Sequence, residues 1–332
     1  QNVTDNVVDL MARNIRELGE ATQRCLRLAA CIGNVFDTST LATVASQSAQ
    51  EVAGALHDAV VRGFILPLAE TYRSVDSSGA ATQARARFRF AHDRVQQAAY
   101  GLISETERGR VHHRIGRLLL ESATNAELEK HPFAIVNHLN MGTAEVLGTA
   151  KIELAELNLV AGRQAKAAAL YDAAHTYLKT GIGLLGDSAW EAHYDIALPL
   201  HVESAQAASL CNDRAGLQGS FDIVRAKGRT VLDKIPVYEA KVAAETRWGD
   251  FRSATATGLE AMSLLGVRYP KKPNALHRHY YVLRARFALR GRAPEDLLDH
   301  RPMTDPLHLA QARVVRAMIV VFFWTGSPYR TL

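Results

Sequence analysis

The sequence predicts a mainly α-helical fold, with a small β-hairpin near the N-terminal end and an array of helices over the rest. Two observations lead to this prediction. Between residues 20 and 90, three helical patterns are followed by two short segments of strand character. From about residue 104 onward, every periodic segment has the helical spacing of apolar residues. We expect a first domain over residues 1–125 and a helical array over residues 126–332.

Each helix of the first domain has a local reason to begin or end. Residues 20–31 carry an apolar stripe that stops before Gly33, and residues 38–45 form a short second helix. Ser48 and Glu51 form a capping-box pattern that opens a third helix, which Gly63 ends.

The hairpin follows directly. Residues 64–68 and 85–90 are the two predicted strands, and residues 76–79 form the turn region between them. The second strand alternates three arginines, Arg85, Arg87 and Arg89, with apolar residues, so one face is cationic and the other apolar. Helix, helix, helix, hairpin is the order of a winged-helix unit.

Direct DNA binding by this unit is one alternative. It would require basic or amide side chains on the outer face of the third helix. That face carries Gln50, Glu51, His57, Asp58 and Arg62, and has no net positive charge. The sequence therefore disfavours DNA recognition, and we expect the three arginines to face an acidic neighbouring domain or solvent.

The helical array begins after a further helix. Ser104 and Glu107 form a second capping-box pattern for an amphipathic helix to about Ser122, and Pro132 suits the first turn of the next one. Three segments then resemble helix-to-helix corners: AGRQAKA from Ala161, CNDRAGL from Cys211 and WGDFRSA from Trp248.

In these corners Gly or Asn tolerates a left-handed helix end, and the small residues Ala167 and Ala254 would let paired helices approach closely. The irregular intervals indicate a degenerate, tetratricopeptide-like array. Such arrays commonly bind peptides or protein domains on a concave surface. We also expect Pro199 to bend its helix, and no sheet after Phe133.

Composition and charge narrow the function classes. The chain has 332 residues, 48% hydrophobic and 22% charged, which is ordinary for a globular protein. Its net charge of +5 lies in residues 268–332, with 12 Lys/Arg against 4 Asp/Glu, whereas residues 126–267 have 13 against 17. We expect the two parts to attract each other or to meet different partners, and we do not expect nucleic acid to bind.

The cysteines, the lengths of the apolar runs and the first residue indicate where the protein is located and whether the chain is complete. Cys25, Cys31 and Cys211 form no CxxC pair, which fits a reducing compartment and argues against structural zinc. Apolar runs such as residues 317–324 fall short of the roughly 20 residues that cross a bilayer, so we expect a cytoplasmic protein. The first residue is Gln1, and we interpret the chain as a piece of a longer protein.

The sequence contains no pattern typical of an enzyme. There is no P-loop, no kinase glycine-rich loop and no nucleophile motif in a strand-turn-helix setting. The adjacent pair His112 and His113 points to different helix faces, so a metal site is not expected, and we interpret the thirteen histidines as surface and capping residues. We therefore expect no cofactor and no metal bound by this segment alone.

The segment FRFAHDRVQQAAYGLISETERGRVHHRIGRLLL, from Phe88, carries a family resemblance. With CLRLAACIGNVFDTSTLATVA before it and FAIVNHLNMG after it, it resembles the region that follows the ATPase domain in large bacterial STAND/AAA-type signalling proteins. Those proteins join a Ser/Thr protein kinase domain, an ATPase, helical repeats and a sensor histidine kinase or nucleotide cyclase. The resemblance covers nearly the whole chain.

The resemblance implies a role for His92 and Asp93. In STAND ATPases a Met-His-Asp-like motif at the last strand-to-helix junction of the winged helix senses the bound nucleotide, and Ala91-His92-Asp93 occupies the matching place. His92 would then donate a hydrogen bond to a phosphate of ADP held by an upstream ATPase domain, and Asp93 would cap the following helix. Both residues acting only as helix caps is the simpler alternative.

Our leading hypothesis is a non-catalytic regulatory segment of a multidomain protein kinase. ATP or ADP would be bound by the parent protein, whose output domain lies downstream, and the helical array would receive a protein or small-molecule signal. The alternative is the equivalent segment of an ATP-dependent transcription regulator whose DNA-binding domain lies outside this chain.

Overall fold

The computed structural model describes residues 3–68, 86–124, 128, 132–186, 188–267, 270, 274–290 and 302–325. Its contacts divide the chain into two compact units, residues 1–154 and 155–332. The predicted mainly α-helical fold with a small sheet is confirmed. The first compact unit includes the helix at Phe133–Met141, which packs against the helix before it, and the domain boundary expected at residue 125 stays a prediction.

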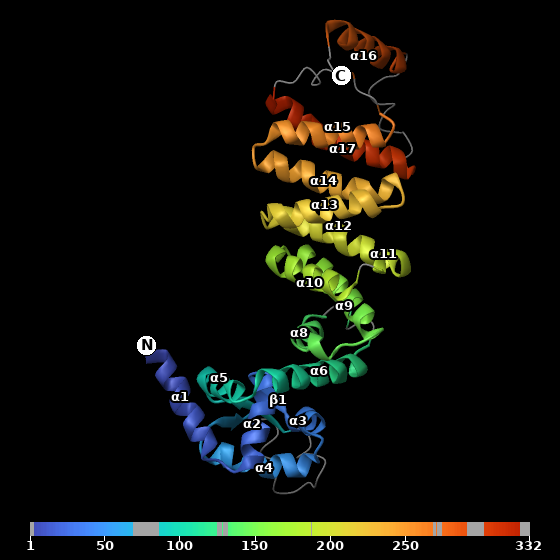
Figure 1. The fold of residues 1–332 in the computed structure, drawn as a ribbon. Coiled ribbons are helices and arrows are strands. Elements are labelled where there is room, and N and C mark those ends of the chain that lie inside the picture. The colour runs from blue at the N-terminus through green and yellow to red at the C-terminus, as the bar shows by residue number, and fades with distance from the viewer. Residues whose placement is uncertain are drawn as a thin grey trace. The chain divides into compact units, whose positions relative to one another are not determined.

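The first unit combines helices with one small sheet (Figure 1). Its elements are α1 (Val3–Arg16), α2 (Glu20–Ile32), β1 (Val35–Asp37), α3 (Thr38–Ala45), α4 (Ala49–Val61), β2 (Ile65–Pro67), β3 (Arg87–Phe90), α5 (Asp93–Gly101), α6 (Glu105–Ser122), α8 (Phe133–Met141) and the 3-10 turn η3 (Thr143–Glu145). The three expected helices before the hairpin are α2, α3 and α4, with bounds within a residue or two of the prediction. The sequence analysis did not find α1 or β1.

The sheet is antiparallel, with the strand order β1-β3-β2. The predicted alternation in β3 is confirmed for its described residues: Arg87 and Arg89 are exposed, and Phe88 and Phe90 are buried. Phe36 of β1 stacks on Phe88, with ring centroids 5.9 Å apart, and its ring is tilted against that of Phe90 at 5.7 Å. The sheet therefore closes one side of the core formed by α2, α4 and α5. Arg85 and the predicted turn at residues 76–79 lie outside the described residues.

The cap predictions are confirmed in part. Ser48 and Glu51 form a complete capping box at α4, and Gly63 follows that helix with φ of +71°. At α6, Ser104 accepts a hydrogen bond from the Glu107 backbone N–H, which is one half of the predicted box.

A glycine sets the distance between α6 and α8. A Cβ atom on Gly116 would lie 2.7 Å from Leu139 Cγ and 3.0 Å from its backbone nitrogen. On the other side, a Cβ on Gly142 would lie 2.7 Å from His113 Cβ. Both contacts are closer than side chains allow, so α8 can approach α6 this closely only because these two positions lack a side chain.

The second unit is helical throughout its described residues. The helices are α9 (Ala150–Ala167, which crosses the division between the units), α10 (Tyr171–Leu184), α11 (Ala189–Ala192), α12 (Tyr194–Leu210), α13 (Arg214–Lys227), α14 (Val231–Arg247), α15 (Phe251–Leu264), α16 (Ala275–Ala288) and α17 (Pro306–Thr325). In Figure 1, α12 to α15 lie side by side in a stack, in agreement with their mutual contacts, and α17 packs on α14 and α15.

Two of the three predicted corners are confirmed. Asn212 and Gly249 have φ of +62° and +75° and lie between successive helices. The prediction of a corner at Ala161 is wrong, because α9 continues to Ala167 and the chain turns at Ala169, which has a φ of +59°. Gly162 instead allows close helix packing, since a Cβ there would lie 2.6 Å from Leu178 Cγ.

The two alanines expected to allow close helix packing differ in their burial. Ala254 is buried between helices as expected, whereas Ala167 is exposed at the end of α9 and mediates no close approach. The helix α12 is continuous through Pro199, and α14 also contains a proline, Pro236. The expected bend at Pro199 stays a prediction.

One helix among the described residues, α17, has the length and composition of a membrane span, over Pro306–Trp324. This departs from the sequence analysis, which judged the apolar runs too short. The core helix of a globular protein passes the same test. On α17 the residues Ala310, Val314, Met318 and Val321 are buried in the core shared with α14 and α15.

We predict opposite effects for one substitution at two helical glycines. Gly116→Ala should lower the free energy of unfolding by about 1–3 kcal/mol, because the new methyl group overlaps Leu139. Gly54→Ala, in α4 with no atom within 4 Å of the new Cβ, should raise it by about 0.5–1 kcal/mol through helix propensity. Urea denaturation of both variants measures the difference. Equal effects would contradict the close approach of α8 to α6.

Candidate functional site

The predicted site lies where β3 turns into α5. Backbone hydrogen bonds hold this junction from two sides: Phe90 N donates to Asn34 O at 3.0 Å, and Ala91 N donates to Phe64 O at 2.9 Å. The next two residues, His92 and Asp93, are both exposed. The junction therefore presents two polar side chains from a rigidly held backbone.

His92 provides the helix cap. Its Nδ1 accepts a hydrogen bond from the Arg94 backbone N–H at 3.1 Å, in the N-cap position of α5. The sequence analysis assigned the cap to Asp93, but Asp93 is the first residue of the helix, where its negative charge suits the helix dipole. A neutral imidazole whose Nδ1 accepts carries its proton on Nε2. His92 thus offers one N–H donor, which contacts no acceptor among the described residues.

A second polar cluster lies beside the junction. Tyr100 on α5, His112 on α6 and His138 on α8 form a chain of hydrogen bonds. The Tyr100 hydroxyl lies 3.0 Å from His112 Nε2, and His112 Nδ1 lies 2.8 Å from His138 Nδ1. A single hydrogen occupies the contact between the two Nδ1 atoms, so one ring donates and the other accepts. We call this chain the histidine relay.

Burial keeps both imidazoles of the relay neutral. It lowers the pKa of His112, where the charge of Arg108 adds to the effect, and it lowers the pKa of His138 to about 4, with His112 contributing. The interpretation of all histidines as surface and capping residues is therefore wrong for His112, which is 4% exposed, and for His201, which is 7% exposed. Only the spacing of His112 from Ile115 on one helix face could have indicated its burial.

The relay borders a cavity of about 520 Å³ within the first unit. Parts of α2, α5, α6 and α8 line it, and Asp93, Gln96, Tyr100 and His138 are among its walls. The described residues contain no group of three or more His, Cys, Asp or Glu side chains placed to hold a metal ion. Asp93 is shared between this hollow and the junction.

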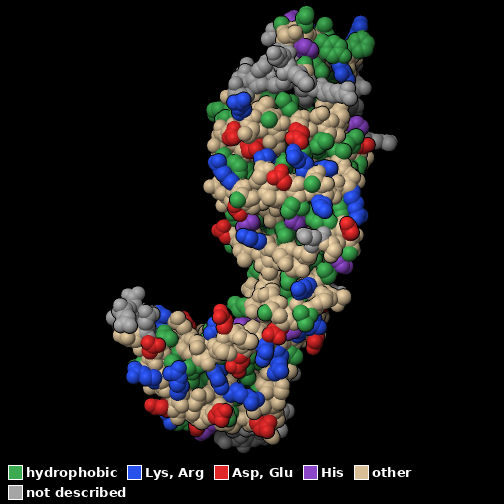
Figure 2. Space-filling model, in the orientation of Figure 1, with side chains coloured by type: hydrophobic (Ala, Val, Ile, Leu, Met, Phe, Trp, Pro, Cys, Tyr) green, Lys and Arg blue, Asp and Glu red, His purple; other side chains and the backbone are tan. Residues whose placement is uncertain are grey.

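The exposed face of the sheet mixes charge with apolar side chains. Arg89 lies in register between Val35 of β1 and Leu66 of β2, which are 41% and 37% exposed. Figure 2 shows Lys and Arg side chains interspersed with Asp and Glu on the visible face of each unit. The expectation that nucleic acid does not bind stays a prediction.

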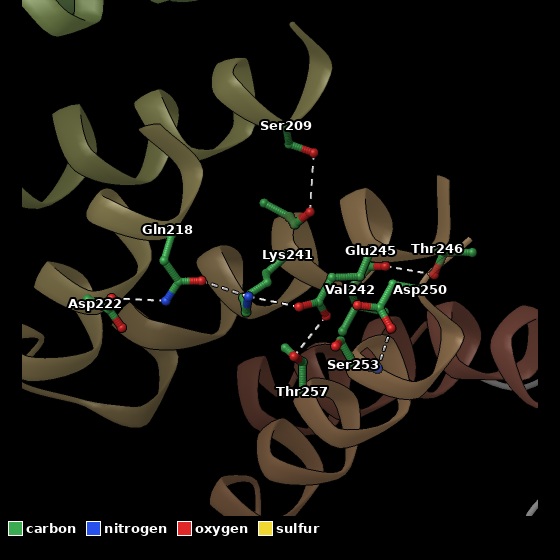
Figure 3. Close-up of polar contacts among 11 residues, drawn as sticks. Ser209, Gln218, Asp222, Lys241, Val242, Glu245, Thr246, Asp250, Ser253 and Thr257 are labelled. Atoms are coloured by element: carbon green, nitrogen blue, oxygen red, sulfur yellow. Dashed lines mark hydrogen bonds and ion pairs between the residues drawn. The ribbon is translucent and has the colours of Figure 1, made fainter. Parts of the chain in front are cut away.

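In the second unit, one carboxylate is buried within the helical stack (Figure 3). Glu245 on α14 is 4% exposed, pairs with Lys241 at 2.7 Å and accepts a hydrogen bond from the Thr257 hydroxyl of α15 at 2.8 Å. Lys241 also donates to Gln218 of α13 at 2.8 Å. The cluster thus joins three successive helices with its charges paired, which is the arrangement of a structural network.

Comparison with known proteins gives one relative. No family model and no solved structure matches the chain. The chain is similar to the hybrid signal transduction histidine kinase G of Dictyostelium discoideum, with 27% identity over 251 residues. The match covers 61% of this chain and 7% of the relative, so the chain corresponds to a small part of that protein's length. The likeness supports a link to signal transduction, while the STAND and winged-helix interpretations remain predictions.

The histidine relay predicts a pH dependence of stability. Folding depresses the pKa values of His112 and His138, so the unfolded chain takes up protons first as the pH falls. The stabilisation is complete above pH 6.5, the ordinary pKa of histidine, and is lost as the pH falls from there to about 4, where His138 titrates in the folded chain. Its size is about 1–3 kcal/mol.

Urea denaturation between pH 7.5 and pH 4 should show a smaller loss for His138→Gln than for the unsubstituted chain. The control is His57→Gln, at an exposed position on α4 away from the relay, which should keep the full slope. Identical slopes in all three chains would contradict the buried, neutral relay.

The Glu245 network predicts a stability effect in the second unit. Glu245→Ala leaves Lys241 and Thr257 without their shared acceptor, and should lower the free energy of unfolding by about 3 kcal/mol. Glu156→Ala, at an exposed position on α9, should change it by less than about 0.5 kcal/mol. Thermal denaturation of the two variants compares them directly, and similar midpoints would refute the role of Glu245.

Proposed function

We propose that this chain is a non-catalytic regulatory segment of a multidomain signalling protein. In this proposal the junction at His92 and Asp93 reads the nucleotide state of an upstream ATPase domain, and the helices of residues 155–332 receive a signal from a partner. The similarity to a signal transduction histidine kinase supports the signalling role. The winged-helix and tetratricopeptide-like identities of the two parts belong to the same proposal.

The observation that carries the proposal is the free donor of His92. Its Nδ1 is engaged by the Arg94 N–H, so its Nε2–H points to no acceptor among the described residues. An exposed, fixed N–H donor at a strand-to-helix junction suits a phosphate oxygen held by a neighbouring domain. ADP or ATP would belong to that domain, and this chain would add one hydrogen bond that depends on which nucleotide is present.

The sheet face supports a contact with an acidic surface. Arg87 and Arg89 project from the same strand that ends at the junction, and they are exposed on the side opposite the core. A domain that holds nucleotide above His92 would lie beside these two arginines if it carries acidic side chains there. The two features would then form one interface, with the donor of His92 at its nucleotide end.

Two substitutions at one position separate the sensor from the helix cap. In the full-length parent protein, His92→Ala removes both the cap and the donor. His92→Asp removes the donor as well, because a carboxylate only accepts, but it can still cap α5 through a side-chain oxygen. The loss of a hydrogen bond to a charged group should speed ADP release about 10-fold in both variants. Release of radiolabelled or fluorescent ADP, followed together with output kinase activity, measures this.

The outcome distinguishes the two roles of His92. Faster ADP release in both variants supports the sensor. If only His92→Ala changes ADP release and His92→Asp behaves as the unsubstituted protein, His92 acts only as a cap and the proposed latch is lost. Gln47→Ala, in the turn between α3 and α4, serves as a control that leaves the junction intact.

A further inference from the structure

The excess positive charge of the chain gathers around one helix. Residues 268–292 contain eight Lys/Arg and no Asp/Glu, whereas residues 293–332 contain four of each kind. The helix α16 lies within the first of these two stretches. It therefore carries arginines but no carboxylate of its own that could pair with them.

The same helix has an apolar stripe that is exposed. Its members follow one another at intervals of four, three and four residues, which places them on one helix face: Leu276, Tyr280, Leu283 and Phe287. Their exposed fractions are 79%, 59%, 62% and 76%. The helices α15 and α17 each bury an apolar stripe in the core, whereas no described side chain of α16 is buried. In Figure 2 green apolar side chains lie at the surface over α16, beside blue and purple basic ones.

Arginines border this stripe on both sides. With about 100° of rotation per residue, Arg284 lies about 70° from the centre of the stripe in one direction, and Arg286 lies about 90° from it in the other. Both side chains are exposed, as is that of Arg290, which follows the end of the helix. The long stem of an arginine extends an apolar surface while its guanidinium group stays in the polar layer at the border.

A stripe bordered by cations matches the surface of an anionic lipid bilayer. A helix that lies flat in the interface buries its apolar face, and its cations meet lipid phosphates and carboxylates on either side. Tyr280 lies at the edge of the stripe nearest Arg284, where a ring with a polar tip suits the headgroup level. The uniform positive charge of residues 268–292 also suits a uniformly negative surface, whereas a protein partner commonly presents both signs of charge.

We propose that α16 docks the chain on the surface of an anionic phospholipid membrane. The helix lies parallel to the surface, with its apolar stripe inserted and with Arg284 and Arg286 on the headgroups. It has 14 residues, or about 21 Å, so it lies on the bilayer and does not span it. This docking goes beyond the proposed regulatory function and is independent of it, because neither His92 nor an ATPase domain takes part.

The test is co-sedimentation of the 332-residue chain with lipid vesicles. We expect binding to phosphatidylcholine vesicles that contain about 30% phosphatidylserine, at about 0.1 M salt. Binding to vesicles of phosphatidylcholine alone should be at least about 10-fold weaker. Raising the salt to about 0.5 M should weaken binding to the anionic vesicles about 10-fold, because salt screens the arginines.

Substitutions at two neighbouring positions separate the stripe from the rest of α16. Leu283→Glu places a carboxylate in the stripe and should weaken binding to the anionic vesicles at least about 10-fold. Val282→Glu adds the same charge on the opposite side of the helix, where Val282 is 42% exposed, and should change binding less than about 3-fold. Replacing both bordering arginines, by Arg284→Gln with Arg286→Gln, should weaken it about 10- to 30-fold. Because all these positions are exposed, each variant should fold, which circular dichroism checks.

Four outcomes would overturn the proposal. The chain does not sediment with the anionic vesicles, or Val282→Glu and Leu283→Glu weaken binding equally. Binding that is lost in Phe323→Glu but kept in Leu283→Glu belongs to the end of α17, where Phe323 is 63% exposed. If the chain binds no vesicles but forms a dimer that Leu283→Glu dissociates, as light scattering measures, α16 is a contact between proteins.

Discussion

The close approach of α8 to α6 is the contact on which the first unit's polar chemistry depends. Gly116 leaves space for Leu139, and Gly142 leaves space for His113, so the two helices meet at backbone distance. At that distance the imidazole of His138 reaches His112, and an open hollow lined in part by α5 and α8 lies beside the two rings. A side chain at either glycine would move α8 outward and would leave His112 buried without its partner.

Glycines also allow close helix packing in the second unit. Leu178 packs over Gly162, Leu200 packs over Gly181, and Met318 packs over Gly258. Each contact allows neighbouring helices to approach where a Cβ atom would collide, so large side chains interdigitate with bare backbone. The stack is held by these steric matches together with paired polar groups such as Glu245 and Lys241. Both kinds of contact link helices that are adjacent in the stack, as in helical arrays generally.

The junction and the relay show how the surroundings of histidine change its chemistry. His92 is exposed and is held by one backbone N–H, so its second nitrogen is available to a partner. His112 and His138 are held by each other and are kept neutral by burial, so they orient hydrogen bonds rather than carry charge. His92 and the relay residue Tyr100 lie at opposite ends of α5, which therefore connects an exposed imidazole with the hydrogen-bonded chain of the relay.

The sequence by itself determined the local features of this protein. Capping at Ser48, the stop at Gly63, the alternation in β3 and the turns at Asn212 and Gly249 depend on a few neighbouring residues, and for these the local pattern was sufficient. Tertiary structure decided the rest. Gly162 has the sequence pattern of a corner, but in the structure it allows Leu178 to pack closely against its helix. The strand β1 is too short to be predicted from its own sequence and is formed by pairing with β3. The partnership of His112 with His138 joins residues from two helices, and no local pattern records it, because the distance between them depends on how α6 and α8 pack.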